Sequence, residues 1–374
     1  MKVRVSLKYL IGFLILAAMV SIASIVFRDY KFEDDVEPNR ELSSLLSADV
    51  KHAFAPVLPN NPVVLPDDSS FHPQHQHEWF HFFANVRDKK GHPYSVQWSY
   101  FRIAHDERVE ELGWLNSQVY FSSVVISTDR KIWREQRVAR GGIGQAGVSA
   151  LPLRMWIDDW TWRSLGRNPF PGHLDVKTDT FSLSLYSDLD GPYVLPGEQG
   201  FQTKHETEPA ATYNLQAPFL KVYGQLKLTK ETDPIAVEGT AFMSKEWGTG
   251  LMSNSQQGWD KFVLKLDDDT TLSVNRYRHD EELPYLFGTL SSKEKTIVLD
   301  NKDIVILPLN KTVIEGGRVM PLEWRIMVPR YNIDLKTAPV NKQSWLPFIV
   351  PYWEGSINTT GSDIAHGYMQ LTGY

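Results

Sequence analysis

Two carboxylates beside tryptophans are the first residues in this sequence that could do chemistry. Glu78 precedes Trp79, and Glu246 precedes Trp247. A carboxylic acid that an apolar pocket keeps protonated can donate a proton, and the face of a tryptophan ring can stabilise a cation. These residue types suit acid catalysis, in which a proton adds to the substrate first and the resulting cation is then stabilised. We therefore predict Glu78 and Glu246 as catalytic, with Trp79 and Trp247 against the ligand.

Four further residues are candidates for the catalytic or ligand-binding site. Asp260 follows Trp259 and could orient water as a base, while Trp259 offers a third aromatic face. Lys245 adjoins Glu246, and the Tyr213 hydroxyl could donate into a cavity. The structural alternative is that the acids are buried ion-pair partners that hold the fold together. The arginines that could pair with them are Arg102, Arg276 and Arg278.

The segment His77–His81 spells the zinc-protease pattern H-E-x-x-H, which brings two histidines around one metal only when the segment is helical. Here Pro73 precedes the pattern and aromatic residues follow it, so a strand is predicted. In a strand the two histidines would lie roughly 13 Å apart, at about 3.3 Å per residue. We predict no metal site, and no cofactor.

The element that must position these residues is a β-hairpin pattern that occurs twice. The first copy runs from His77 through the turn Asp88–Gly91 to Ser95–Gln97, and the second runs from Trp259 through Asp267–Asp269 to Ser273–Asn275. Apolar residues alternate with polar ones in further segments, and Gly, Asp, Asn and Pro recur between them. We predict an all-β fold of two antiparallel β-barrels, over residues 71–231 and 232–374.

Length, charge and composition limit the classes of function. The chain has 374 residues, which suits two domains of ordinary size. Its net charge is −6 and it has no basic run, so the attraction that drives nucleic-acid binding is missing. It contains no cysteine, which excludes disulfides, thiolate metal sites and a cysteine nucleophile. We therefore expect no nucleic-acid partner.

The N-terminal residues 1–28 have the features of a membrane-directed segment. Lys2, Arg4 and Lys8 precede the apolar run Tyr9–Phe27, which as a helix would span roughly 28 Å. Positive charges in front predict that the body is exported, either anchored in the inner membrane and facing the periplasm, or released there after cleavage near Ser21–Ala23. Residues 29–70, acidic and then rich in proline, are expected to form a stalk.

Several motifs, in order, give the chain a resemblance to the AttH-like proteins and carotenoid 1,2-hydratases, also called hydroxyneurosporene synthases. His77–Phe80 resembles the family's Thr-Glu-Trp-Trp, Trp156–Trp160 its Trp-Leu-Asp-Asp-Trp, and Lys245–Trp247 its Arg-Glu-Trp. Gly258–Asp260, Tyr352–Gly355 and Leu371–Tyr374 follow in the family's order. The resemblance implies two lipocalin-like β-barrels in tandem and an apolar ligand, such as a polyene or a lipid.

The resemblance leaves two functions open. The hydratase branch carries a histidine two residues before the tryptophan that corresponds to Trp247, and this chain has Lys245 there. An ordinary lysine pKa of about 10.4, against about 6.5 for histidine, makes the two poor substitutes in proton transfer. The first function is a hydro-lyase that adds water to a double bond or isomerises it. The alternative is a non-catalytic ligand-binding or accessory protein that works beside a membrane transporter.

Overall fold

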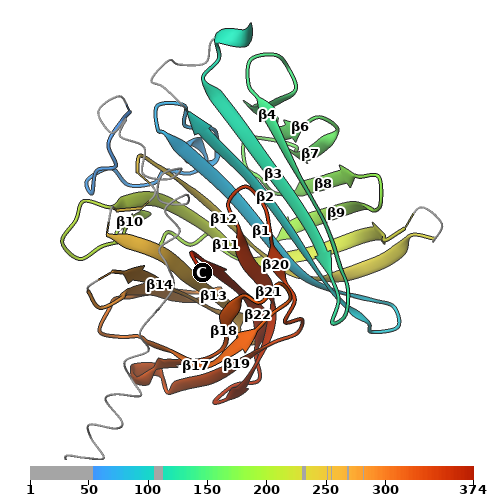
Figure 1. Ribbon diagram of the computed structural model, residues 1–374. Coiled ribbons are helices and arrows are strands. Elements are labelled where there is room, and N and C mark those ends of the chain that lie inside the picture. The colour runs from blue at the N-terminus through green and yellow to red at the C-terminus, as the bar shows by residue number, and fades with distance from the viewer. Residues whose placement is uncertain are drawn as a thin grey trace, which may run out of the picture. The chain divides into compact units, whose positions relative to one another are not determined.

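The computed structural model describes residues 54–104, 113–229, 233–250, 252–253, 255–267, 269–280 and 282–374. Within these ranges the protein is all-β, as predicted, and its only helices are the 3₁₀ turns Asp67–Ser69, Gly113–Leu115 and Pro329–Tyr331. The strands form two antiparallel sheets (Figure 1). No helix within the described ranges is long and apolar enough to cross a membrane. The predicted membrane segment 1–28 lies outside the described residues.

The first sheet has the strand order β4-β3-β2-β1-β12-β11-β9-β8-β7-β6-β5, with β10 on β11. It curls into a nearly closed barrel, since Tyr100 of β2 donates hydrogen bonds to backbone oxygens of Gly147 in β5 and Trp156 in β6. The strands are β1 His77–Asp88, β2 Pro93–Ala104, β3 Gln118–Ser127, β4 Ile132–Arg140, β5 Ala146–Ala150, β6 Leu153–Ile157, β7 Trp160–Ser164, β8 Gly172–Lys177, β9 Ser182–Leu189, β10 Phe201–Thr203, β11 Ala211–Lys227 and β12 Ile235–Gly248.

The second sheet is a half-barrel with the order β16-β15-β14-β13-β22-β21-β19-β18-β17, and β20 pairs with β21. Its interior is apolar, and Phe262 of β13 packs edge-on against the buried Trp324 of β18. The strands are β13 Gln256–Lys265, β14 Thr270–His279, β15 Tyr285–Ser292, β16 Thr296–Leu299, β17 Val305–Val313, β18 Val319–Val328, β19 Ile333–Pro339, β20 Trp345–Leu346, β21 Tyr352–Gly361 and β22 His366–Thr372.

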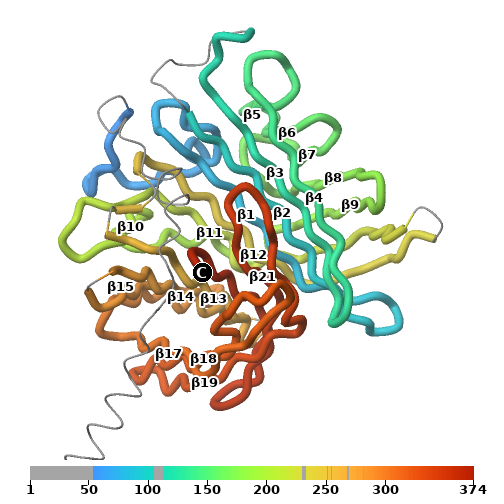
Figure 2. The backbone as a smooth tube through the Cα atoms, in the orientation of Figure 1, coloured from blue at the N-terminus to red at the C-terminus, as the bar shows by residue number. Residues whose placement is uncertain are grey.

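The alternation of side chains along β1 determines what each residue meets. Phe80 and Phe82 point into the apolar core of the first sheet. Phe83, on the opposite face, packs in a cluster with Phe242 of β12 and with Val263 and Tyr368 of the second sheet. The outer face of β1 and β12 is therefore covered by the second sheet. β21 (Figure 2) also meets β1, since Ser356 Oγ donates to Asn85 Oδ1 at 2.6 Å.

The two predicted hairpins are present as β1–β2 and β13–β14, and they carry equivalent charged pairs. Glu78 lies opposite Arg102 in the first hairpin, and Asp260 lies opposite Arg276 in the second. The expected division after residue 231 falls between β11 and β12, which are neighbours in the first sheet. The chain passes to the second sheet only after Gly248. Residues 54–70 of the predicted stalk include Val63 and Ser69, which are buried.

Candidate functional site

The predicted catalytic residues are divided between two faces of the central strands. β12 pairs with β1, so that Lys245 lies opposite Phe80 and Glu246 lies opposite Trp79. Because neighbouring residues of a strand point to opposite faces, Lys245 turns toward the interior of the first sheet and Glu246 turns toward the second sheet. The structure therefore brings Glu78 together with Lys245, and it separates both from Glu246.

Glu78 and Lys245 form a buried ion pair in which the Lys245 Nζ lies 2.9 Å from Glu78 Oε1. The same Nζ donates to the backbone oxygens of Asp68, at 2.7 Å, and Ser70. The other Glu78 oxygen accepts the His72 backbone N–H at 2.8 Å. Burial by itself would raise the pKa of Glu78, but Lys245 and His72 outweigh it and hold that pKa far below its usual range. Glu78 is therefore an ionised carboxylate and does not hold a proton that it could donate to a substrate.

Trp247 and Tyr213 belong to the surroundings of this ion pair. Trp247 stacks on the His72 ring with centroids 4.3 Å apart, and the Lys245 Nζ lies 4.8 Å from the Trp247 ring centroid. The Tyr213 hydroxyl accepts the backbone N–H of Leu58 at 2.9 Å, so it ties residues 54–70 to β11. Neither aromatic residue lines any of the three hollows described below.

Asp260 is the centre of an equivalent network inside the second sheet. Its oxygens lie 2.8 Å from Arg276 Nη1 and 2.5 Å from Arg278 Nη1, and they accept the Tyr374 hydroxyl at 2.9 Å. The Asp260 side chain is fully buried. The arrangement matches the structural alternative that the sequence left open for such acids, and it places Asp260 away from the cavity that contains Glu246.

Glu246 lines a polar cavity between the two sheets. The cavity has a volume of about 30 Å³, which is room for about one or two water molecules. Its walls come from β1, β11 and β12 on one side and from β13, β14, β15 and β22 on the other. The lining residues are Trp79, His81, Asn214, Gln216, Ser244, Glu246, Trp259, Lys261, Asn275, Tyr277, Phe287 and Gln370.

The charged groups of this polar cavity come from distant parts of the chain. Glu246 is bound to the Nζ of Lys204, which lies just after β10. The His81 Nε2 lies 2.7 Å from Glu354 Oε1 of β21, although the angle is not that of a hydrogen bond. Lys261 Nζ donates to Ser244 Oγ at 3.2 Å. Burial lowers the Lys261 pKa to about 8, against the opposing pull of Glu246 and Glu354.

Several buried polar atoms at this cavity make no hydrogen bond to any residue that the structure describes. They include both ring nitrogens of His81, the Asn214 Oδ1 and the Gln216 Oε1. Buried polar atoms in native proteins are nearly always hydrogen-bonded, so atoms of this kind point to a bound polar group. A cavity of this size and polarity fits water.

An apolar pocket of about 110 Å³ shares two residues with the polar cavity. Trp79 and Trp259 line both hollows, and their rings meet edge to face with centroids 6.2 Å apart. Each indole N–H is fixed by a hydrogen bond, from Trp79 to Ser99 Oγ at 2.7 Å and from Trp259 to Gln370 Oε1 at 2.9 Å. The other lining residues are Ser99, Phe101, Ile103, Phe121, Ser123, Gln136, Ile349, Val350, Tyr352 and Thr372.

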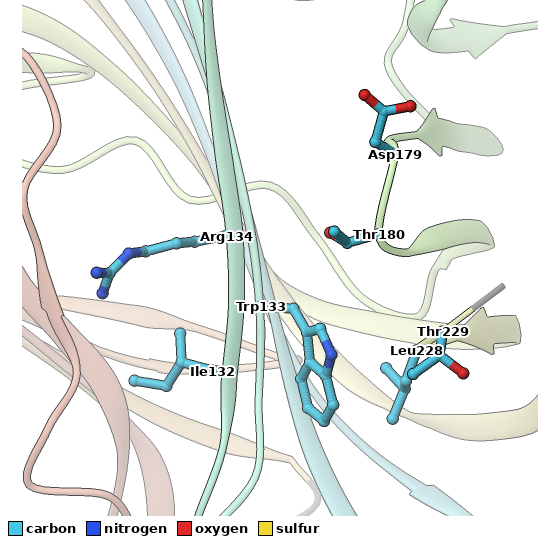
Figure 3. Close-up of a pocket in the computed structure, with 7 residues that line it drawn as sticks. All are labelled: Ile132, Trp133, Arg134, Asp179, Thr180, Leu228 and Thr229. Carbon is cyan, nitrogen blue, oxygen red and sulfur yellow. The ribbon is translucent and has the colours of Figure 1, made fainter.

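A third hollow, of about 570 Å³, lies away from these residues and is open. It is bordered by the start of β4, the β8–β9 turn and the residues after β11 (Figure 3). Trp133 and Leu228 give it an apolar wall, while Arg134 points away from it and donates to the Trp345 backbone oxygen at 2.8 Å. Among its described lining residues no group of proton-transferring side chains converges, so we regard the two hollows between the sheets as the candidate site.

Sequence reasoning missed His81, Lys261, Lys204 and Glu354 as site residues. Two of them had a local signal, since His81 and Lys261 each follow a predicted ligand-binding tryptophan by two residues and so share its strand face. Lys204 and Glu354 had none, because only the packing of the two sheets brings them to the cavity. The described residues contain no group of three or more potential ligands arranged to hold a metal ion.

The fold and the site together define a two-sheet β protein with an apolar pocket that adjoins a buried polar cavity. The model of the AttH-like family matches residues 56–374, and the chain belongs to this family. No curated protein sequence matches the chain.

Two solved structures are similar over most of their length. The crystal structure of an AttH protein of Nitrosomonas europaea has a TM-score of 0.77 at 24% identity, over 86% of this chain and 100% of that one. Kievitone hydratase of Nectria haematococca has a TM-score of 0.62 at 14% identity, over 83% of this chain and 93% of that one. At these identities the likeness shows a shared fold.

Proposed function

We propose that this protein binds an apolar, alkene-bearing small molecule between its two lipocalin-like sheets and adds water across a carbon–carbon double bond. The observation that supports this proposal best is that Trp79 and Trp259 separate an apolar pocket from a water-sized polar cavity. Hydration needs an apolar place for the substrate, a proton donor and a positioned water side by side. The name of the related kievitone hydratase is consistent with this chemistry on the shared fold.

The pair formed by His81 and Glu354 is the proton donor in this proposal, because His81 Nε2 and Glu354 Oε1 lie 2.7 Å apart and each group can carry an exchangeable proton. Transfer of that proton to one alkene carbon leaves a cation on the other, which the faces of Trp79 and Trp259 stabilise. Water held near Glu246 then adds its oxygen to the cation. Glu246 accepts the extra proton, which returns to the His81–Glu354 pair through the cavity, so that the net change is the addition of one water.

The test is incubation with a panel of polyenes and mass spectrometry for a gain of one water. Glu246→Gln and Glu354→Gln should each lower turnover roughly 100-fold, the lower end of the usual contribution of acid–base catalysis. The matched control is Glu238→Gln, an exposed glutamate on the same strand as Glu246, and it should keep full activity. Full turnover in both cavity variants, with their fold intact, would rule out this assignment.

A non-catalytic binding protein, working beside a membrane transporter, is the second candidate. It is favoured by the ion pairs of Glu246 with Lys204 and of Glu78 with Lys245, since carboxylates held in this way do not act as strong acids. Native mass spectrometry of the purified protein separates the two functions. An apolar molecule that co-purifies, without turnover of any polyene, would support binding alone.

We also propose that residues 1–28 place the protein outside the cytoplasm, either anchored in the inner membrane or cleaved and free in the periplasm. The support is the apolar run Tyr9–Phe27 behind three basic residues. Cell fractionation and the intact mass of the mature protein test this point. Recovery of the full-length chain in the cytoplasmic fraction would contradict it.

A further inference from the structure

Lys204 and Lys261 lie at the contact between the two sheets, Lys245 lies on the inner face of the first sheet, and among the described residues Lys261 is the one of the three without a carboxylate partner. Lys204 contacts Glu246, and Lys245 lies 2.9 Å from Glu78. The Lys261 Nζ instead donates to Ser244 Oγ and lies 5.3 Å from the Phe242 ring centroid. Among the side chains that the structure describes, no carboxylate oxygen lies within ion-pair distance of this Nζ. Of the three amines, that of Lys261 is therefore the one that no described ion pair holds in place.

The surroundings of Lys261 favour its neutral, nucleophilic form. Burial and the nearby positive charge of Lys204 lower its pKa to about 8, while Glu246 and Glu354 pull the other way. At pH 7 such a lysine has on the order of 100-fold more free amine than an ordinary lysine with a pKa near 10.4. Removal of water and a neighbouring cation are the known means of activating a lysine toward carbonyl groups.

We propose that Lys261 is a site of reversible imine formation with an apolar aldehyde. The aldehyde chain would lie in the apolar pocket, and its carbonyl carbon would meet the Lys261 Nζ in the polar cavity, past Trp79 and Trp259. The amine attacks the carbonyl carbon, a new C–N bond forms, and the carbonyl oxygen leaves as water, so that an aldehyde and an amine give an imine and one water. No oxidant or reductant is needed.

The polar cavity provides what each stage requires. Its volume of about 30 Å³ is close to that of one formyl group or one water. Glu246 can accept and return the protons that move during dehydration, and Glu246 and Glu354 offer negative charge to a protonated imine. The other titratable groups at this cavity are His81 of β1, Tyr277 of β14 and Lys204, which contacts Glu246. The ligand class is an apolar aldehyde of moderate length.

This inference does not depend on hydration. The proposed hydratase reaction gives Lys261 no covalent role, and imine capture requires no alkene. If the protein captures an aldehyde but hydrates no polyene, this inference stands and the proposed hydration fails. If it hydrates a polyene but captures no aldehyde, the proposed hydration stands and this inference fails.

The test is reductive trapping of the full-length protein with citral, an apolar ten-carbon aldehyde, and cyanoborohydride at pH 7. Peptide mapping should place an adduct of the aldehyde mass, less one water and plus two hydrogens, on Lys261. Labelling of Lys261 should exceed that of Lys221, an exposed lysine of the same chain, by at least about tenfold. As the pH rises from 6, the labelling of Lys261 should level off near 8, while that of Lys221 continues to rise.

Lys261→Arg is the matched variant, since it keeps the positive charge and cannot form the imine, and it should lose the specific adduct only. Its melting temperature shows whether it folds. If it does not fold, site mapping in the natural protein decides the question alone. Equal labelling of Lys261 and Lys221 in the folded protein, or an unchanged adduct in a folded Lys261→Arg variant, would overturn the inference.

Discussion

Glu78 illustrates how a residue that appears catalytic in the sequence can have a structural role in the fold. Its carboxylate is buried, paired with Lys245 and bonded to the His72 backbone N–H. A buried carboxylate with this set of partners remains ionised, and its energetic effect is to hold residues 68–72 against β1 and β12. In the hydration reaction that we propose, the His81–Glu354 pair therefore has the role of proton donor.

At the residue scale we predict a pH-dependent contribution of Glu78 to stability. Glu78→Gln leaves Lys245 without its carboxylate and should lower the free energy of unfolding by about 3–5 kcal/mol at pH 7. Because the folded-state pKa of Glu78 lies below its ordinary 4.5, its contribution is full above that pH and is lost as the pH falls further. The difference between the two proteins in urea unfolding should therefore shrink below pH 4.5.

The control for this prediction is Asp334→Asn, which removes an exposed pair with Arg325 and should cost about 1 kcal/mol or less. An equal cost for both variants at pH 7, or a difference that stays constant down to pH 3, would contradict the assigned role of Glu78.

At the scale of the element, β1 has two faces with two functions. Phe80 lies in the first-sheet core, whereas Trp79 lines both hollows between the sheets. Phe80→Ala should lower the free energy of unfolding by about 3–5 kcal/mol. Trp79→Ala should change ligand binding more than stability, since the Trp79 side chain is part of the wall between the apolar pocket and the polar cavity. Chemical unfolding and ligand titration, performed on both variants, measure this contrast. If one variant had the larger effect on both the free energy of unfolding and ligand binding, this contrast would be refuted.

The close approach of β12 to β1 gives a second prediction about an element. A Cβ added at Gly239 would lie 2.1 Å from the Asn85 backbone oxygen and 2.8 Å from the Val86 Cα. Since backbone cannot move aside without disturbing the sheet, Gly239→Ala should destabilise the protein by about 1–3 kcal/mol. Gly166→Ala is the matched control, because its Cβ would meet nothing within 4 Å. The melting temperatures of the two variants test this prediction. An unchanged melting temperature for Gly239→Ala would show that the two strands can move apart to admit the added methyl group.

At the scale of the whole molecule, the change of sheet after Gly248 sets where the chain can be divided. β12 lies between β1 and β11, so a chain that ends at residue 231 leaves both of these central strands with an unpaired edge. We expect a fragment 54–250 to unfold cooperatively and a fragment 54–231 to lack a cooperative transition. Circular dichroism during urea unfolding and resistance to proteolysis measure this. Equal behaviour of the two fragments would show that β12 is dispensable.

The sequence by itself determined the features that depend on neighbouring residues. Alternation and turn residues gave the all-β class and both hairpins, and the ordered motifs identified the AttH-like family. The sequence also singled out Trp79 and Trp259, which line both the apolar pocket and the polar cavity, and their contact with a ligand stays a prediction. These features are local, because a strand, a tight turn and the two faces of a strand are set within a few residues.

Only the tertiary structure decided which charged groups share a cavity. Glu246 and Lys245 are neighbours in the chain, but they face opposite sides of β12 and meet Lys204 and Glu78 respectively. Glu354 lies 2.7 Å from His81 in the fold, although 273 positions separate the two residues in the chain. Pairing between distant strands is set by how whole sheets pack, and no short pattern records it. The face of a strand on which a residue lies is determined by the local sequence, whereas the partner that its side chain contacts is determined by the tertiary packing of the sheets.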